Sequence, residues 1–497
     1  MSGFAQLLRA EWTKLRTVPG WVGGVLAAAA VIVGIGLLPG MQGSCGKHGP
    51  GSECVLPVGP GGEQVTDRFF FVHRPLAGDG TITVRVTALT GMLPAGTDEP
   101  DGMRPGVAPW AKAGLIVKDG TRPGSAYAAV MVTGSHGVRM QYNYTHDTAG
   151  SPGPVSEAAP RWLRLTRSGD TVTAAESADG TAWTTVGIAH LAGLPPTVQV
   201  GLFATSPQFA ETVHESGMSG AYGGPTQVTA VFDHVTPDGA WTDEFVGAVG
   251  GGPAGKVEQA GGRFTVTGSG DIAPAVAGAA GIGTTVTQTL VGTFAGLIAV
   301  IVVAALFITA EYRRGLIRTT LSAVPRRGRV LAAKAVVVGA VTFVAGLAGA
   351  TLVVALGQRI LRGNGVYVFP ATALTEVRLV VGTAALLAVT AVLALAIGAI
   401  VRRSAATVAA ALVVIVLPYL LALTVLPAGA AQWLLRVTPA AAFAIQQSVV
   451  PYPQVSNLYT PAGGYFPLAP WTGLAVLGGW AVLAFTVAVV LLRRRDA

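Results

Sequence analysis

Histidine is the side chain most often used for metal binding and for acid–base chemistry near neutral pH, and this chain has seven. No two of them have the spacing of an H-x-H, H-x-x-x-H or H-E-x-x-H motif, and no G-x-S-x-G nucleophile motif is present. We therefore predict no catalytic residue, no metal site and no bound cofactor. The histidines are interpreted as ordinary side chains of one folded domain: His48, His73, His136, His146, His190, His214 and His234.

The two cysteines, Cys45 and Cys54, are close enough in sequence to form a disulfide that closes a short glycine-rich loop. Such a bond persists only in an oxidising compartment, so this prediction requires the loop to lie outside the cytoplasm. The alternative is a pair of unrelated thiols. A zinc site is disfavoured because no further cysteine or histidine has ligand spacing to the pair.

Six apolar runs dominate the rest of the chain. About 20 apolar residues let a helix cross the roughly 30 Å hydrocarbon core, and a helix satisfies its own backbone polar groups, as lipid requires. The chain is 51% apolar and 12% charged, with a mean hydropathy of +0.56. We predict a membrane α-helical bundle of six transmembrane helices that contain no Asp, Glu, Lys, Arg or His: 21–38, 290–309, 335–356, 380–400, 405–426 and 472–492.

Basic residues indicate which ends of these spans lie in the cytoplasm. Residues 47–271 include 14 Lys and Arg against 21 Asp and Glu, so the basic excess lies in the remainder of the chain. There, 15 of 19 basic residues cluster at one set of span ends, and only Arg359, Arg362, Arg378 and Arg436 fall at the other. Since basic residues near span ends stay in the cytoplasm, we predict a multi-pass plasma-membrane protein with both termini cytoplasmic and residues 40–289 extracellular. The net charge of +8 therefore reflects topology and gives no reason to invoke nucleic acid.

The segment before the first span, within residues 1–39, has a helical pattern of its own. Arg9 and Arg16 lie off a face that combines apolar residues with a single acid: Phe4, Leu7, Leu8, Glu11, Trp12 and Leu15. We interpret it as an interfacial helix in the cytoplasmic headgroup layer. A cleaved signal peptide is the alternative, but its apolar core has about 7–15 residues and the run at 21–38 is longer.

Residues 40–271, inserted between the first and second spans, have the pattern of a soluble β domain. Runs of alternating polarity are divided by turn signals such as Ser168-Gly169-Asp170 and Asp179-Gly180. Many short strands with regular turns predict an all-β antiparallel sandwich with its core at about 65–236. The predicted strands are 81–88, 114–118, 126–133, 137–145, 161–166, 171–177, 183–188, 197–205 and 227–235. The Gly-, Ala- and Ser-rich stretch 247–283 is interpreted as a linker with one further strand at 263–268.

Four segments of this domain resemble the concanavalin A-like, laminin-G-like jelly-roll modules of bacterial surface proteins: WAKAGLIVKDGT, AAVMVTGSHGVRMQY, RWLRLTRSGDTVTAAESADGTAWTTVG and VQVGLFATS. The resemblance implies a jelly-roll sandwich, a fold that often binds glycans. Related glucanases need two carboxylates at i and i+4 of one strand, and no predicted strand has such a pair. The aromatic residues Tyr142, Tyr144, Trp162 and Trp183 either stack on a sugar or belong to the core of the sandwich.

The composition of the spans disfavours one class of transporter. Ion-driven carriers bind protons or ions at ionisable groups inside the membrane, and such groups cost about 2.5–3.5 kcal/mol each at a helix centre, so they appear only for function. The six predicted spans have none, and the chain has no G-x-x-x-x-G-K-[ST] phosphate loop. Any transport by the bundle must therefore be powered by ATP hydrolysis on a separate subunit.

The loop after the second span, EYRRGLIRTTLSAVPRRGRVLAAK at 311–334, is the strongest candidate for a contact with such a subunit. Leu316, Ile317, Leu321 and Val324 form one apolar face of a short helix, and 325–328 then turns the chain into the third span. A short amphipathic helix of this kind fits the groove of a partner protein. The alternative is a basic loop that holds anionic lipid headgroups.

The order of these parts resembles the permease subunits of ABC transporters of the ABC-2 export type, especially those of actinobacteria. The resemblance rests on FAQLLRAEWTKLRT before the first span and EYRRGLIRTTLSAVPRRGRVLAAKAVV after the second. It implies a homodimer or a pair of permeases, and a separate ABC ATPase subunit that docks on a coupling loop at 311–329. The coupling residues that it implies are Glu311, Tyr312, Arg313, Arg314, Leu316, Ile317, Arg318, Thr319, Leu321, Arg326 and Arg327.

Segment 437–470 of the membrane domain, which covers 272–497, resembles a second feature of these permeases. After Arg436 it carries no charge, yet six prolines interrupt it. It is too broken to span and too apolar to be freely solvated. We predict a re-entrant or interfacial segment on the outer side, before the last span.

These features together predict a permease subunit of an ATP-driven ABC-2-type exporter, embedded in the lipid bilayer and not itself an enzyme. Its external sandwich would gate, receive or recruit substrate, and would bind a glycan. The insertion is larger than in many relatives, so a second interpretation is kept: a non-transporting, membrane-anchored glycan-binding receptor or envelope anchor. A membrane-bound glycosidase is disfavoured because paired carboxylates are absent.

Overall fold

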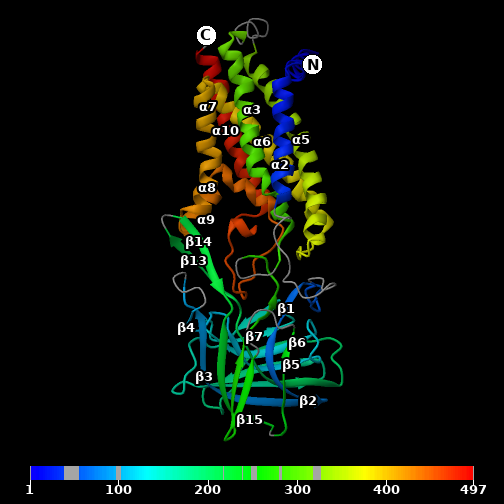
Figure 1. Cartoon of the computed structure of the whole chain (residues 1–497), viewed down its shortest axis with the longest axis vertical. Coiled ribbons are helices and arrows are strands. Elements are labelled where there is room, and N and C mark those ends of the chain that lie inside the picture. Colours follow the sequence, from blue (N-terminus) through cyan, green and yellow to red (C-terminus); the bar gives the residue numbers. More distant parts are fainter. Residues whose placement is uncertain are drawn as a thin grey trace.

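A helical bundle and a β sandwich follow one another along the long axis of the molecule (Figure 1). The computed structural model describes residues 2–38, 55–96, 102–215, 218–237, 239–247, 255–278, 283–316 and 326–495. Within these residues, six helices are long and apolar enough to cross a membrane, and the sandwich is formed by the chain between the first and the second. The predicted fold class is therefore confirmed.

Each predicted span overlaps one helix of the bundle or one run of consecutive helices. The α-helices are α1 Ser2–Thr17, α2 Pro19–Leu37, α3 Gly292–Arg313, α5 Arg327–Gly363, α6 Ala373–Val401, α7 Ser404–Ala411, α8 Leu417–Thr424, α9 Ala428–Val437 and α10 Pro470–Arg495. Three short 3₁₀ helices also occur in the described residues: η2 Val286–Leu290, η4 Pro439–Gln446 and η5 Pro461–Gly463. A π-helical turn, η3 Leu412–Val416, lies between α7 and α8. With 37 residues, α5 is about 55 Å long and exceeds the thickness of a hydrocarbon core.

The fifth span is interrupted by a π-helical turn. α7 continues through η3 into α8, and Pro418 lies in the first turn of α8. Proline removes one backbone donor and its ring crowds the preceding turn, so the helix widens just before it. The span therefore remains one continuous helical segment, and the direction of its axis changes at η3.

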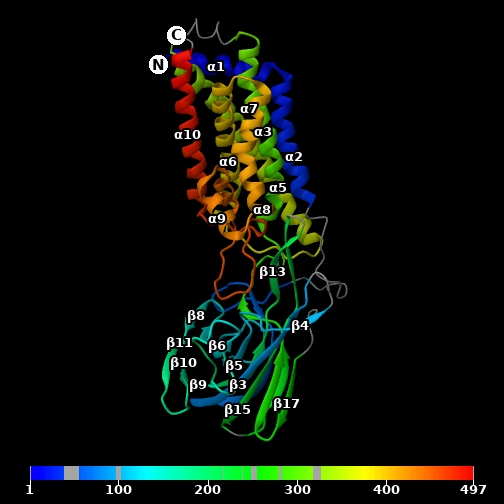
Figure 2. The ribbon, with the colours of Figure 1, turned by 90° about the vertical axis from the view of Figure 1, so that its left-hand side faces the viewer.

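The N-terminal helix α1 lies across the end of the bundle that is far from the sandwich (Figure 2). Glu11 and Leu15 are buried against the bundle, while Arg9 and Arg16 are exposed, as the periodicity predicts. Trp12 differs from the prediction, because 47% of its surface is exposed. The buried face of α1 is thus narrower than the apolar pattern indicates.

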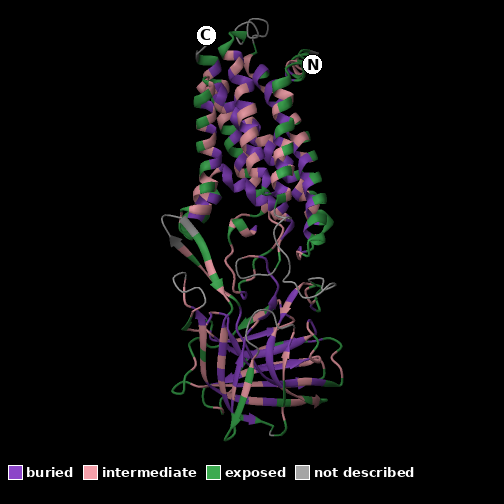
Figure 3. Ribbon diagram, viewed as in Figure 1, coloured by how far each residue is buried: buried purple, intermediate pink, exposed green. Residues whose placement is uncertain are grey.

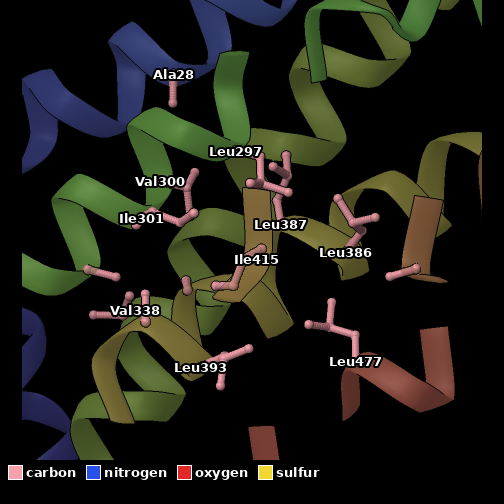
Figure 4. Packing of buried hydrophobic residues seen from close by; sticks show 14 of the residues in the cluster. Ala28, Leu297, Val300, Ile301, Val338, Leu386, Leu387, Leu393, Ile415 and Leu477 are labelled. Carbon is pink, nitrogen blue, oxygen red and sulfur yellow. The ribbon is translucent and has the colours of Figure 1, made fainter. Parts of the chain in front are cut away.

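The core of the bundle is built from α3, α5 and α6, with contributions from the surrounding helices. Figure 4 shows Leu297, Val300 and Ile301 of α3 facing Leu387 and its neighbours, and these residues belong to one buried cluster. The alternation of large aliphatic residues with alanine and glycine lets these helices interlock at close distance.

Helices α2 and α3 approach each other most closely where Gly292 and Gly296 face Ile32. A Cβ atom at Gly292 would overlap the backbone carbonyl of Ile32, and one at Gly296 would overlap its side chain. This G-x-x-x-G pair presents a flat surface, as in many membrane helix pairs. Packing across this surface joins the two spans that flank the sandwich.

The sandwich consists of two main antiparallel sheets. The seven-stranded sheet has the order β16 Thr242–Val246, β2 Phe69–Ala77, β12 Thr197–Thr205, β5 Lys112–Lys118, β6 Tyr127–Thr133, β7 Val138–Tyr142 and β8 His146–Ala149. The eight-stranded sheet has the order β11 Thr184–His190, β10 Thr171–Ser177, β9 Arg161–Ser168, β3 Gly80–Pro94, β15 Gln227–Thr236, β18 Arg263–Gly268 and β17 Lys256–Ala260, with β4 Met103–Pro105 paired to β3.

Two small ribbons extend from the sandwich towards the bundle. Strand β1 Val65–Asp67 pairs with β19 Ile272–Pro274, so the two chain segments that connect the sandwich to the spans are hydrogen-bonded to each other. The second ribbon is the hairpin of β13 Phe209–Glu215 and β14 Met218–Gly224. Figure 1 shows this hairpin between the sandwich and α9, and β14 contacts α8.

The main core of the sandwich lies between the two sheets, where Figure 3 shows a continuous buried layer. Strand β9 illustrates how this buried layer forms. Leu163 and Leu165 are buried, while Trp162 and Arg164 alternate with them on the outer face. A strand places successive side chains on opposite faces, so this alternation buries one face.

The seven-stranded sheet is also buried on its second face. Phe69, Phe71, Tyr127, Phe203 and the side chain of Ile272 form a separate core cluster there. Strands β5 and β6 are buried throughout, and β2 is buried over Phe69 to Val72, so these stretches are not alternating in polarity. This explains why the alternation rule does not reveal β2.

Two parts of the sandwich differ from the sequence-based expectation. The strand predicted at 137–145 is divided by a turn in which Asn143 and Tyr144 have φ values of 43° and 64°, so β8 runs back along β7. In the stretch interpreted as a linker at 247–283, the predicted strand at 263–268 is confirmed as β18, but β17 and β19 are additional, and Phe264 and Val266 of β18 enter the core. The predicted pair of cysteines lies outside the described residues.

Candidate functional site

Four charged side chains form a buried network at the end of the bundle that carries both termini. Lys334 Nζ of α5 donates to Glu11 Oε2 of α1 at 2.7 Å and to Glu311 Oε1 of α3 at 2.6 Å. Lys14 Nζ of α1 donates to Glu11 Oε1 at 2.9 Å and to Glu311 Oε1 at 3.0 Å. Each lysine thus bridges both glutamates, which joins three helices at one point.

The network is balanced in charge and almost fully removed from solvent. The side chains of Lys334 and Glu11 are each 1% exposed, that of Glu311 is 8% exposed, and that of Lys14 is 40% exposed. Burial by itself lowers the pKa of Lys14, but the hydrogen bonds and charges of Glu11 and Glu311 raise it overall. Removing one partner from such a buried pair leaves an uncompensated charge, so the network is sensitive to single substitutions.

The members of the network come from three helices. Glu11 lies on the buried face of α1, Glu311 lies in the last turn of α3, and Lys334 lies in the third turn of α5. Lys334 Nζ also lies 5.3 Å from the centre of the Phe307 ring, which shields it on the bundle side. The network therefore connects both helices that flank the loop at 314–326 with the interfacial helix.

Glu11 and Glu311 are singled out by the sequence pattern, but the pattern does not pair them with a cation. One feature of the sequence does indicate a buried ion pair: Glu11 is an acid in the middle of an apolar helix face, where it requires a partner. Lys334 directly precedes the apolar run at 335–356, so it reads as the cytoplasmic end of a span. Only the packing of α1 against α5 brings the two residues together.

The structure describes seven of the eleven predicted coupling residues. Glu311 is in the network, Tyr312 lies under the guanidinium of Arg402 at 5.1 Å, and Arg327 donates to the carbonyl of Leu492 at 2.9 Å. Arg313, Arg314, Leu316 and Arg326 are exposed. The remaining four lie outside the described residues: Ile317, Arg318, Thr319 and Leu321.

The segment predicted to be re-entrant contains a fully buried turn at the opposite end of the bundle. All eight residues of η4 are buried, and η4 packs against α6 and α10. Gln446 Nε2 donates to Thr293 Oγ1 of α3 at 3.0 Å and to Thr383 Oγ1 of α6 at 3.1 Å. These bonds hold the end of η4 inside the bundle.

A second group of charges lies inside the sandwich, under the β1–β19 ribbon. Lys118 Nζ and the Tyr144 hydroxyl each donate to Asp67 Oδ2 at 2.7 Å, and Lys112 Nζ donates to Asp271 Oδ1 at 2.7 Å. Burial lowers the pKa of Lys118 despite the opposing charge of Asp67, and it raises the pKa of Tyr144. These pairs join the ribbon to the sheet.

The four aromatic residues considered for sugar stacking have different positions. Tyr144 is fully buried, and Tyr142 stacks on His146 with ring centres 4.1 Å apart. Trp162 and Trp183 are partly exposed on the outer side of the eight-stranded sheet, and the Arg164 guanidinium lies 3.6 Å from the Trp183 ring centre. The two tryptophan rings thus lie at the outer surface of the sandwich, each beside an arginine.

A family model described as "ABC-2 family transporter protein" matches residues 171–497, which is more than half of the chain. The chain belongs to the ABC-2 transporter family. As an ABC-2 family member with six membrane-length helices, it is a multi-pass transporter component of the membrane. The buried network and the loop at 314–326 both lie within the family match except for α1. No curated protein matches the sequence.

Solved structures provide only weak likenesses. A functionally unknown protein from Saccharomyces cerevisiae has 16% identity over 27% of this chain and 62% of its own length, with a TM-score of 0.19. Two structures of scytalido-glutamic peptidase with transition-state analogs have 12% and 10% identity, cover 41% and 40% of this chain and 98% of their own, and have TM-scores of 0.26 and 0.23. Scores this low say nothing about the function of the ABC-2 chain.

Proposed function

We propose that this chain is the permease subunit of an ATP-driven exporter, that it acts as a homodimer or paired with a second permease, and that a separate ABC ATPase docks on the loop at 311–329. The single observation that carries the proposal is the buried network of Glu11, Lys14, Glu311 and Lys334. It joins the helices at both sides of the docking loop to the interfacial helix.

The network gives a physical route from docking to movement of the spans. A force on the loop acts on the last turn of α3 and the first turns of α5, and the ion pairs prevent these ends from separating. Because packed helices move as rigid units, closure of the ATPase would tilt both spans and α1 together. The spans would then alternate between inward-open and outward-open states.

Docking is tested by co-purification of the ATPase with the full-length permease. Replacing Leu316 and Ile317 with Glu places two charges on the predicted docking face, and we expect the ATPase to be lost from the purified complex. Leu374→Glu is the matched control, because Leu374 is 84% exposed at the far end of α6 and should leave co-purification unchanged. Unchanged recovery of the ATPase with the double variant would refute docking at this loop.

The proposal also fixes the orientation, with both termini cytoplasmic and residues 40–289 outside. In the structure the two termini lie at one end of the molecule and the sandwich at the other, which is consistent with the basic residues near the termini. In a Cys45→Ser, Cys54→Ser background, an impermeant maleimide should label Thr181→Cys on intact cells and Arg403→Cys only after permeabilisation. Both sites are exposed. The reverse labelling pattern would overturn the orientation.

For the sandwich we propose a jelly-roll module that receives a glycan on the outer face of its eight-stranded sheet. The supporting observation is the group of Trp183, Arg164, Trp162 and Arg85, which places two rings beside two guanidinium groups on the outer face of the sheet. Rings of this kind stack on sugars, and arginines donate to hydroxyls. Trp183→Ala should reduce binding of the full-length protein to cell-wall polysaccharide, whereas Trp110→Phe, at a ring buried against His136, should not.

The receptor or anchor alternative makes a different prediction from the exporter. If no ATPase co-purifies with the unaltered chain and polysaccharide binding depends on Trp183, the bundle serves only to hold the sandwich in the membrane. If an ATPase co-purifies and depends on Leu316 and Ile317, the exporter is supported. The two outcomes are read from the same purified protein.

A further inference from the structure

A cavity of about 700 Å³ lies where the sandwich meets the bundle. Its wall has three parts: Thr212, Gly220 and Ala221 of the β13–β14 hairpin, residues 422–436 of α8 and α9, and residues 451–467 of the segment before α10. The volume falls within the roughly 300–1,000 Å³ that is usual for small-molecule sites. Both domains therefore contribute residues to the wall of the cavity.

The interior of the cavity is apolar. Leu423, Leu426, Leu435 and Phe466 supply aliphatic and aromatic surface. The polar ends of two lining tyrosines are already bonded, since the Tyr465 hydroxyl donates to the Ala277 carbonyl at 2.9 Å and the Tyr459 hydroxyl donates to the Tyr452 carbonyl at 2.7 Å. The tyrosines thus offer a ligand their rings rather than their hydroxyls.

One charge lies at the edge of this apolar space. Arg436, in the last turn of α9, is exposed, and among the described residues that line the cavity it is the only charged one. None of these described lining residues is a carboxylate that would neutralise it. A ligand that fills the space and reaches its edge would therefore complement Arg436 with an anionic group.

Exposed tryptophans place the cavity at the level of a membrane interface. Trp433 of α9 is 63% exposed and Trp471 in the first turn of α10 is 57% exposed. Trp480 Nε1 donates to the Val437 carbonyl at the end of α9. Tryptophan is enriched at headgroup depth because its ring is apolar and its N–H is polar. The cavity thus lies where an acyl chain and its headgroup meet.

We propose that this cavity binds a single-chain amphiphile with an anionic headgroup, with its acyl chain among Leu423, Leu426 and Phe466 and its headgroup at Arg436. The inference rests on the proposed function, because the ligand would be the transported substrate bound in the outward-open state of the permease. The β13–β14 hairpin closes the site from the sandwich side, which gives the inserted domain a direct role in retaining or releasing this ligand. Binding itself requires neither nucleotide nor the ATPase.

The test is equilibrium binding of fluorescent lysophosphatidic acid to the purified full-length permease in nanodiscs, without ATPase. Saturable binding is expected, with weaker binding of a monoacylglycerol of the same chain length and no binding of glycerol phosphate, which lacks the chain. Arg436→Gln should weaken lysophosphatidic acid binding about tenfold or more, since a charge-assisted hydrogen bond is lost. Arg359→Gln is the matched control, because Arg359 is exposed at the same end but does not line the cavity.

A second variant separates the cavity from the membrane surface. Ala221 is exposed on β14 and lines the cavity, so Ala221→Trp would fill the space without disturbing a buried position, and it should abolish binding. Binding that is unchanged in Ala221→Trp, or equal for lysophosphatidic acid and the monoacylglycerol, would overturn the proposal. Co-purification of the ATPase is measured in a separate experiment. A cavity that does not bind the lipid can therefore be distinguished from a loop that does not dock the ATPase.

Discussion

Lys334 of α5 donates a hydrogen bond of 2.7 Å to Glu11 of α1, although the two residues are 323 positions apart in sequence. Both side chains are 1% exposed, and each also contacts a second member of the network. Helix α1 is thus joined to the start of α5, near the residues at which the chain enters the third span.

The first prediction concerns the stability of this network. Lys334→Met should lower the free energy of unfolding by about 3–5 kcal/mol, because it leaves Glu11 and Glu311 buried with only one partly exposed cation. Lys14→Met removes the member that is 40% exposed and should cost less than about 1 kcal/mol. Unfolding of the detergent-solubilised proteins measures both values, and equal losses would contradict the account.

A second prediction separates docking from transmission of movement. Lys334→Gln leaves the exposed face of the loop unchanged, so ATPase recovery should match that of the unaltered protein. Stimulation of ATP hydrolysis by the permease should nevertheless fall, because α1, α3 and α5 are no longer joined. A variant that loses the ATPase altogether would show that the network shapes the docking site itself.

A third prediction concerns the packing of η4 on α10. A Cβ atom at Gly473 would overlap the carbonyl of Ala441 and lie 2.9 Å from the Cβ of Ala444, so Gly473→Ala should displace η4 and lower thermal stability. Gly478→Ala, on the same helix with nothing within 4 Å, should be neutral or slightly stabilising. If the two variants melt at the same temperature, the close contact is not present in the folded protein.

A fourth prediction concerns the hydrogen bonds of Gln446. Gln446→Leu removes its bonds to Thr293 and Thr383 and should cost about 1 kcal/mol, since a hydrogen bond between membrane helices contributes about 0.6 kcal/mol on average. Thr383→Val should cost little once Gln446 is already Leu, because the shared bond is gone. Additive losses in this double-mutant cycle would argue against a direct interaction.

A fifth prediction follows from the buried tyrosines of the sandwich. Burial, together with the charge of Asp67, raises the pKa of Tyr127 and Tyr144 above the ordinary value of 10.0. The unfolded state therefore loses these protons first, so the stability they contribute is fully present below about pH 10 and is lost as the pH rises further. The phenolate absorbance of these two tyrosines, measured as the difference between the unaltered protein and its Tyr127→Phe and Tyr144→Phe variants, should appear together with unfolding of the sandwich, and not before it.

The spans and the sandwich were predictable because their signals are local. A charge-free apolar run of about 20 residues is long enough to cross a bilayer whatever its neighbours are. Likewise, alternation at 161–166 and turn residues at Ser168-Gly169-Asp170 identify β9 and β10 from their own sequence. Strand β2 escaped this reasoning because both faces of its first half, Phe69 to Val72, are buried, which removes the alternation there.

The partners of the charged residues could not be predicted in the same way. Glu11 is conspicuous on an apolar face, but nothing within its own helix satisfies it fully, and Lys334 resembles any basic residue at the end of a span. Similarly, Ala221, Leu435 and Phe466 are ordinary residues until the hairpin, α9 and the segment before α10 enclose one cavity.

Length, hydropathy and charge along the chain therefore specify which segments are helices and strands and which ends of the spans share a side, since each depends on neighbouring residues. The network at Lys334 and the cavity at Arg436 depend instead on which surfaces pack together. That packing is decided by shape and by satisfaction of buried charges between segments far apart in sequence, so it exists only in the folded chain.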